Sequence, residues 1–75
     1  MPYIKKARRG EIPVTAGELN CALTQVCKQY LEIKGESYQT YNDILGALSG
    51  ASQELYRRKI APYEDEAIKR NGDVF

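Results

Sequence analysis

The 75-residue sequence contains no histidine and no tryptophan, and its only cysteines are Cys21 and Cys27. Six residues apart on a helix, the two thiols would point about 120° away from each other, which favours neither a local disulfide nor a shared metal. Two cysteines without histidine also make no zinc-binding set. We therefore expect reduced, partly buried thiols and no cofactor.

The same absences argue against catalysis. Neither cysteine has a neighbour in the sequence that would activate it as a nucleophile. The glycines form no phosphate-binding loop of the P-loop or dinucleotide-fold type. We therefore expect that the protein is not an enzyme.

Long hydrophobic runs are also missing. No stretch approaches the roughly 18 apolar residues of a membrane span, and the N-terminus lacks the apolar core of a signal peptide. We expect a soluble, cytoplasmic protein without a membrane partner.

Charge is balanced overall but unevenly placed. Eleven basic residues face ten acidic ones, so bulk attraction to a nucleic acid polymer is not expected. Four cations nevertheless fall within the first nine residues: Lys5, Lys6, Arg8 and Arg9. This arm is either a solvated terminus or a segment that closes over an anion.

The length of the chain limits its core. A chain this short buries only about 60% of the surface that its unfolded form exposes. The core of such a chain is marginal without a disulfide, a metal or a partner subunit. Since the sequence supports neither of the first two, we expect the extra buried area to come from other copies of the chain.

The chain divides into an N-terminal arm, residues 1–14, and a single helical domain, residues 15–75. Thr15 followed by Glu18 predicts a capping box at the start of a first helix, and Gly35 predicts its end. Apolar residues recur in alternating steps of four and three along one seam: Leu19, Leu23, Val26, Tyr30 and Ile33. This spacing is typical of a helix that packs against one partner helix.

A second helix is expected to begin between Ser37 and Thr40, and either hydroxyl could cap it. Its apolar face is broader than one partner can cover: Tyr41, Ile44, Leu45, Leu48, Ala51, Leu55 and Ile60. Pro62 disfavours a helical conformation at Ala61, so the chain should kink or restart there and form a third, short helix. The predicted fold is all-α, a helical hairpin plus a short C-terminal helix, assembled into an oligomeric helical bundle.

Small residues interrupt the second helix. Gly46 and Gly50 lie four apart, with alanines and serines beside them, and each costs roughly 0.5–1 kcal/mol relative to alanine. Such a strip allows either a close crossing between chains or a flat ligand ring to approach. We assign Gly46, Gly50 and Leu48 to a subunit interface.

Several polar and aromatic residues could hold a ligand. Arg57 and Arg58 are candidates for a forked contact with a phosphate, although both could simply be solvated. Thr40 and Asn42 at a helix start offer a hydroxyl and an amide to a base edge, although capping alone would explain Thr40. Four tyrosines are candidates for stacking on a base, or alternatively for interface contacts: Tyr3, Tyr38, Tyr56 and Tyr63.

Specific sequence blocks extend over nearly the whole chain. They are Met1-Pro2-Tyr3-Ile4, Gly17-Glu18-Leu19-Asn20, Ser37-Tyr38-Gln39-Thr40-Tyr41-Asn42-Asp43-Ile44, Gly46-Ala47-Leu48, Tyr56-Arg57-Arg58, Ala61-Pro62-Tyr63-Glu64-Asp65 and Asn71-Gly72-Asp73-Val74. These blocks resemble a family of very short phage and prokaryotic proteins catalogued as a domain of unknown function. The segment between Ile4 and Gly17 is shorter than the family pattern, which leaves the role of the basic arm open.

In size, helical content and expected tetrameric state the chain is similar to the phage anti-CBASS sponge proteins. Those proteins bind cyclic dinucleotides such as 3′3′-cGAMP and hide this signal from the host effector. The resemblance implies a homotetramer in the bacterial host cytosol, with a pocket between subunits and no turnover of the ligand. Two other functions stay open, a small helical adaptor or inhibitor that binds a host protein and a nucleic-acid contact through residues 5–9.

Overall fold

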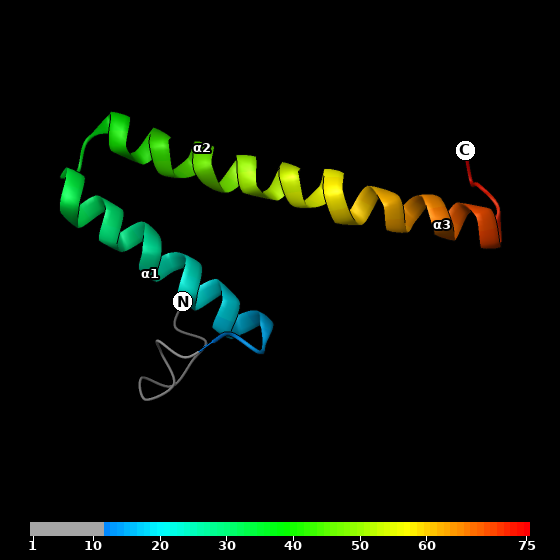
Figure 1. The fold of residues 1–75 in the computed structure, drawn as a ribbon. Coiled ribbons are helices and arrows are strands. Elements are labelled where there is room, and N and C mark those ends of the chain that lie inside the picture. The colour runs from blue at the N-terminus through cyan, green and yellow to red at the C-terminus, as the bar shows by residue number, and fades with distance from the viewer. Residues whose placement is uncertain (1–11) are drawn as a thin grey trace. The chain divides into compact units, whose positions relative to one another are not determined.

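The computed structural model describes residues 12–75, and these residues are helical with no strand among them (Figure 1). The elements are α1 (Ala16–Lys34), α2 (Tyr38–Leu55), the π-helical turn η2 (Tyr56–Ile60) and α3 (Ala61–Asn71). They belong to two compact units, one ending at Ile44 and the other comprising Leu45–Phe75. The all-α prediction is confirmed, whereas the hairpin packing and the oligomeric bundle stay predictions.

The start of α1 follows the capping pattern. Thr15 has an extended backbone, and its side-chain hydroxyl accepts a hydrogen bond from the Glu18 N–H at 3.1 Å. The Glu18 carboxylate in turn accepts from the Val14 N–H at 2.8 Å, one residue before the position that the capping box predicts. Two backbone donors at the helix start are thereby satisfied.

The connection between α1 and α2 depends on Gly35 and Ser37. Gly35 has a φ of 84°, where an L side chain is strained, and its N–H donates to the Leu31 carbonyl at 2.8 Å. The Ser37 hydroxyl accepts from the Thr40 N–H at 3.1 Å, and the Ser37 carbonyl accepts from the Tyr41 N–H at 3.0 Å. Ser37 is therefore the cap of α2, and Thr40 lies within the first turn.

Hydrogen bonds around Asp43 tie the two helices of the first unit together. The Tyr30 hydroxyl on α1 donates to Asp43 Oδ2 at 2.9 Å, and Gln39 Nε2 donates to Asp43 Oδ1 at 2.8 Å. The hydrogen bonds from Gln39 and Tyr30 lower the pKa of Asp43. The bond between Tyr30 and Asp43 also raises the pKa of Tyr30.

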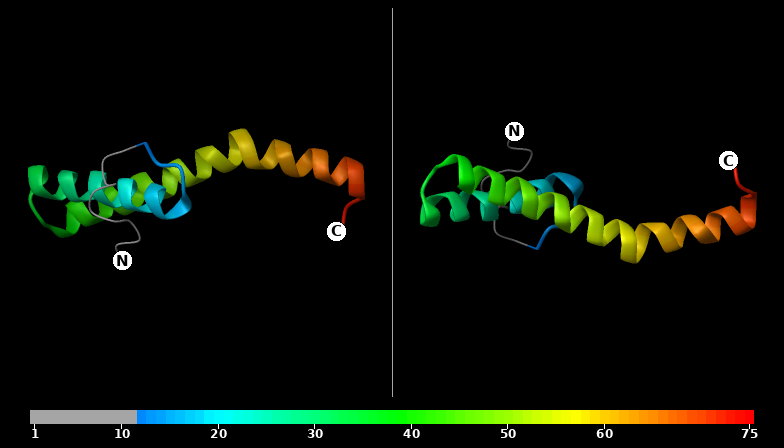
Figure 2. Two further views of the ribbon diagram at one scale, coloured as in Figure 1. Left: turned by 90° about the horizontal axis from the view of Figure 1, so that it is seen from below. Right: turned by 90° about the horizontal axis from the view of Figure 1, so that it is seen from above.

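The chain bends near Pro62, in line with the expected kink, but the expectation that Ala61 leaves the helical conformation is wrong. Ala61 is α-helical, with φ −59° and ψ −47°, and its N–H donates to the Tyr56 carbonyl, five residues back. The ring of Pro62 would clash with a carbonyl in a regular α-helix and provides no N–H. The wider π-turn accommodates both effects, so the helix continues with a bend, which Figure 2 shows at the yellow segment.

The third helix otherwise follows the prediction. Pro62 lies in the first turn of α3. Gly72, with a φ of 83°, ends the helix by donating its N–H to the Ile68 carbonyl at 2.8 Å.

Across residues 12–75, no apolar side chain is buried, and Thr40, 6% exposed, is the buried residue of this segment. Large apolar side chains on every α-helix remain open, including Val26 at 63% and Leu45 at 64% exposed. Cys21 and Cys27 are free thiols and half-buried, as expected. Among the described helices, none has the length and apolar character needed to cross a membrane.

Candidate functional site

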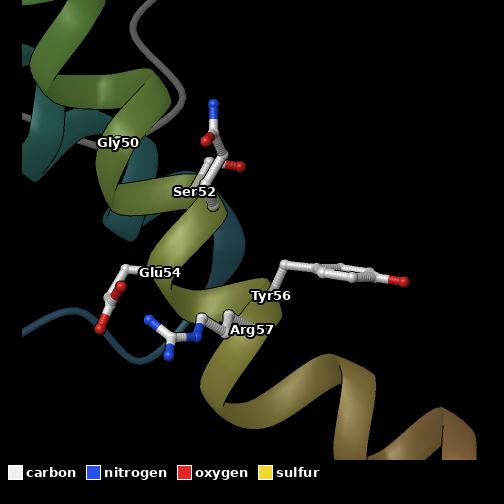
Figure 3. A pocket seen from close by; sticks show the side chains of 6 residues that line it. Gly50, Ser52, Glu54, Tyr56 and Arg57 are labelled. Carbon is white, nitrogen blue, oxygen red and sulfur yellow. The ribbon is translucent and has the colours of Figure 1, made fainter.

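An open hollow lies in the second unit, where the last turns of α2 lead into η2 (Figure 3). We call it the Gly50 hollow. Its lining residues are Gly50, Ser52, Gln53, Glu54, Tyr56 and Arg57. All come from one continuous stretch of eight residues, so the local helix positions them.

Gly50 opens the floor of this hollow. A Cβ added at Gly50 would meet no other atom within 4 Å, and the same holds for Gly46 one turn earlier. The surface of the hollow at Gly50 is therefore helix backbone rather than a side chain. A flat or branched group can approach closely there.

The two arginines differ in their surroundings. Arg58 Nε forms an ion pair with Glu54 Oε1, one turn back, as its spacing in the sequence allows. Both side chains are well exposed, at 72% and 51%, so the pair adds little to stability. In the part of the chain that the structure describes, Arg57 makes no ion pair and no side-chain hydrogen bond. Arg57 is therefore a cation whose five donors remain available.

Polar side chains neighbour Arg57 along the helix. Gln53 follows Gly50 by three residues and precedes Arg57 by four, so all three share one face. Its amide nitrogen donates to the Ser49 hydroxyl at 3.2 Å, which orients the amide. We did not select Gln53 from the sequence, although its spacing from Gly50 and Arg57 was a signal that could have identified it.

Tyr56 is fixed at its hydroxyl and open at its ring. The hydroxyl donates to Glu64 Oε2 on α3 at 3.2 Å, spanning η2. This bond to a carboxylate raises the pKa of Tyr56. The residue is 48% exposed, and in Figure 3 the ring points away from the Glu54 and Arg57 head groups. Tyr56 can therefore offer a ring face at the edge of the hollow.

The remaining predicted ligand residues do not line this hollow. Tyr63, on α3, is 69% exposed. Tyr38, 82% exposed, and Asn42 lie in the first turns of α2 in the other unit. Tyr3 lies outside the described residues.

Thr40 is the predicted ligand residue whose surroundings are most closed. It is buried, and its hydroxyl is hydrogen-bonded to Ser37 Oγ at 3.0 Å. Capping of α2 accounts for its position. Nearby, the Tyr41 hydroxyl donates to Glu36 Oε1 at 2.7 Å, which raises the pKa of Tyr41.

The predicted interface residues fall on two faces of α2. Leu48 lies two residues from both Gly46 and Gly50, which places it about 200° around the helix axis from each. Leu45 and Leu55, three residues before and seven after Leu48, share its face. A single partner helix therefore cannot cover Leu48 and the two glycines together.

Metal chemistry has no visible support within residues 12–75. No three His, Cys, Asp or Glu side chains in this range gather where they could hold a metal ion. The residues that line the Gly50 hollow offer hydrogen bonding, aromatic stacking and attraction of negative charge.

Family comparison covers almost the whole chain. Residues 1–74 match the family described as "Domain of unknown function (DUF6899)", and the chain belongs to this family. No curated protein and no solved structure matches the chain. Membership in this family shows which proteins the chain is related to, but the family description names no activity. The function is therefore argued from the site.

Proposed function

We propose that the protein is a phage immune-evasion protein that sequesters a cyclic dinucleotide, such as 3′3′-cGAMP, and thereby inhibits CBASS defence in the host cytosol. It holds the ligand without cleaving it. The observation that carries the proposal concerns the Gly50 hollow: Arg57, which has no ion pair within residues 12–75, lines it beside polar side chains, and the half-exposed Tyr56 offers its ring at the edge.

The chemistry of the hollow matches the parts of such a ligand. A phosphodiester carries negative charge and two oxygens that a guanidinium can fork onto. Gln53 offers an amide on the face of the helix that carries Gly50 and Arg57. A base presents a flat ring, for which Tyr56 provides a stacking partner. The resemblance to sponge proteins in size, helical content and expected tetrameric state adds support.

Assembly is part of the proposal. The apolar side chains of the described helices are exposed in one chain, which favours their burial against further copies. We place a contact between copies on the face of α2 that carries Leu45, Leu48 and Leu55, in a homotetramer. Burying an apolar face against a second copy stabilises the assembly by about 25 cal/mol for each Å² of apolar surface removed from water.

Titration calorimetry of the purified protein with cyclic dinucleotides tests the proposal. We expect heat of binding, a thermal shift that grows with ligand concentration, and recovery of intact ligand after denaturation. A linear dinucleotide in the recovered sample would contradict sequestration without cleavage. Absence of heat and of any thermal shift with every cyclic dinucleotide in large excess would refute the proposed function.

The alternative is a small helical adaptor or inhibitor that binds a host protein. The exposed apolar residues of α1, such as Val26 and Ile33, favour it if assembly leaves them open. A host protein recovered at fixed stoichiometry, together with no heat from cyclic dinucleotides, would support the adaptor over the sponge.

A further inference from the structure

We infer that Arg57, and not Arg58, binds the phosphodiester of the ligand, at a site that one chain builds in the Gly50 hollow on the side of α2 away from Leu48. This inference rests on the proposed function and names the residue that provides the charge. It follows from the different partners of two neighbouring cations.

The Arg58 guanidinium already has an anion. Its Nε is held by Glu54 one turn back, and Glu54 also lines the hollow. A ligand phosphate would have to compete with that carboxylate for Arg58. Arg57 lines the hollow and has no carboxylate partner within residues 12–75, so a phosphate would not have to displace a carboxylate that is already bonded to Arg57.

Arg58 nevertheless affects the site indirectly. Glu54 is a negative charge in the lining, and the ion pair with Arg58 offsets that charge. Without Arg58, the Glu54 carboxylate would repel an anion and attract Arg57. Arg58 is thus a positioning residue, and its effect depends on the presence of Glu54.

The position of Gly50 on the helix determines how many ligand-binding sites stay accessible in an assembly. Gly50 and Leu48 lie on nearly opposite sides of the helix, about 160° apart, so a copy that covers the Leu48 face does not cover Gly50. A Cβ at Gly50 would meet nothing within 4 Å, which is the space a ligand needs. Each chain therefore offers one accessible site after assembly.

Calorimetry with 3′3′-cGAMP on matched variants tests the assignment. Arg57→Ala should weaken binding about tenfold or more, since a charged hydrogen-bonded contact is lost, and Arg57→Lys should recover part of the affinity. Arg58→Ala should weaken binding less. The double variant Glu54→Gln with Arg58→Ala should bind more tightly than Arg58→Ala alone, because the carboxylate left unpaired in the single variant is removed as well.

Arg70→Ala is the control for loss of one positive charge on the exposed end of α3. It should leave affinity unchanged, and circular dichroism and sedimentation should show every variant folded and assembled like the wild type. We expect one ligand per chain. Wild-type affinity in Arg57→Ala, or one ligand per two chains, would overturn the inference and leave the proposed function standing. No binding by the wild type would refute the proposed function itself.

Discussion

Replacing Gly46 or Gly50 of α2 by alanine changes the stability of the protein. The sign of this change depends on whether another chain packs against the helix face that carries the two glycines. Alanine is more favourable than glycine in a helix interior by about 0.8–1.0 kcal/mol. Neither Gly46 nor Gly50 has an atom within 4 Å of an added Cβ, so no steric cost opposes this gain. We therefore expect Gly46→Ala and Gly50→Ala each to stabilise the folded protein by about 1 kcal/mol.

The two variants should differ in ligand binding. Gly50 forms the floor of the hollow and Gly46 does not line it. A methyl group at position 50 stands where a ligand would approach the backbone, so Gly50→Ala should weaken binding of a cyclic dinucleotide. Gly46→Ala should bind it normally, and is the matched control for a changed helix propensity.

The change in free energy of unfolding is measured by denaturant unfolding, monitored by circular dichroism. The subunit concentration must be held constant, because the stability of an assembled protein depends on it. Ala47→Gly, an exposed position in the same turn, is the reverse control and should cost about 1 kcal/mol.

The opposite sign would refute the reasoning. If Gly46→Ala or Gly50→Ala destabilised the protein or dissociated it, a second chain would cross closely at these glycines, and the Gly50 hollow would not be open in the assembly. Equal ligand affinity in both variants, with both more stable, would leave the open face intact but exclude Gly50 as the floor of the site.

Three further outcomes are expected. Thr15→Ala should destabilise α1 by about 1 kcal/mol in denaturant unfolding, because the Glu18 N–H loses its cap, whereas Thr15→Ser should retain the stability. Leu48→Glu should lower the sedimentation coefficient by weakening assembly, and an unchanged coefficient would exclude this face as a contact. Glu64→Gln should lower the pKa of Tyr56, measured from tyrosinate absorbance and identified with Tyr56→Phe. Since the folded-state pKa of Tyr56 is raised, its contribution to stability is present below the unfolded pKa and is lost as pH rises through the folded value.

Much of the local structure was predictable because the decisive interactions join residues close in the chain. The Thr15 cap, the Gly35 end and the Gly72 end all depend on hydrogen bonds between residues three or four apart. The ion pair of Glu54 and Arg58 is of the same kind. Spacing in the sequence carries enough information to predict features of this kind.

The candidate site was predictable only in part. Tyr56 and Arg57 are neighbours in the chain, and both line the Gly50 hollow. Gln53 was overlooked, since a glutamine on an exposed helix has many ordinary explanations. Thr40 was chosen for its place at a helix start, where its own burial and its bond to Ser37 could not be foreseen.

The amino-acid order is enough to dictate which segments are helical and where they start and stop, because capping and helix propensity act within one turn. It does not dictate which of two equally placed hydroxyls caps α2, or how the chain passes Pro62. Those choices depend on where side chains and carbonyls lie in three dimensions, since a hydrogen bond forms only within a narrow range of distance and angle. In the structure Ser37 caps α2, and a π-turn before Pro62 allows the helix to continue.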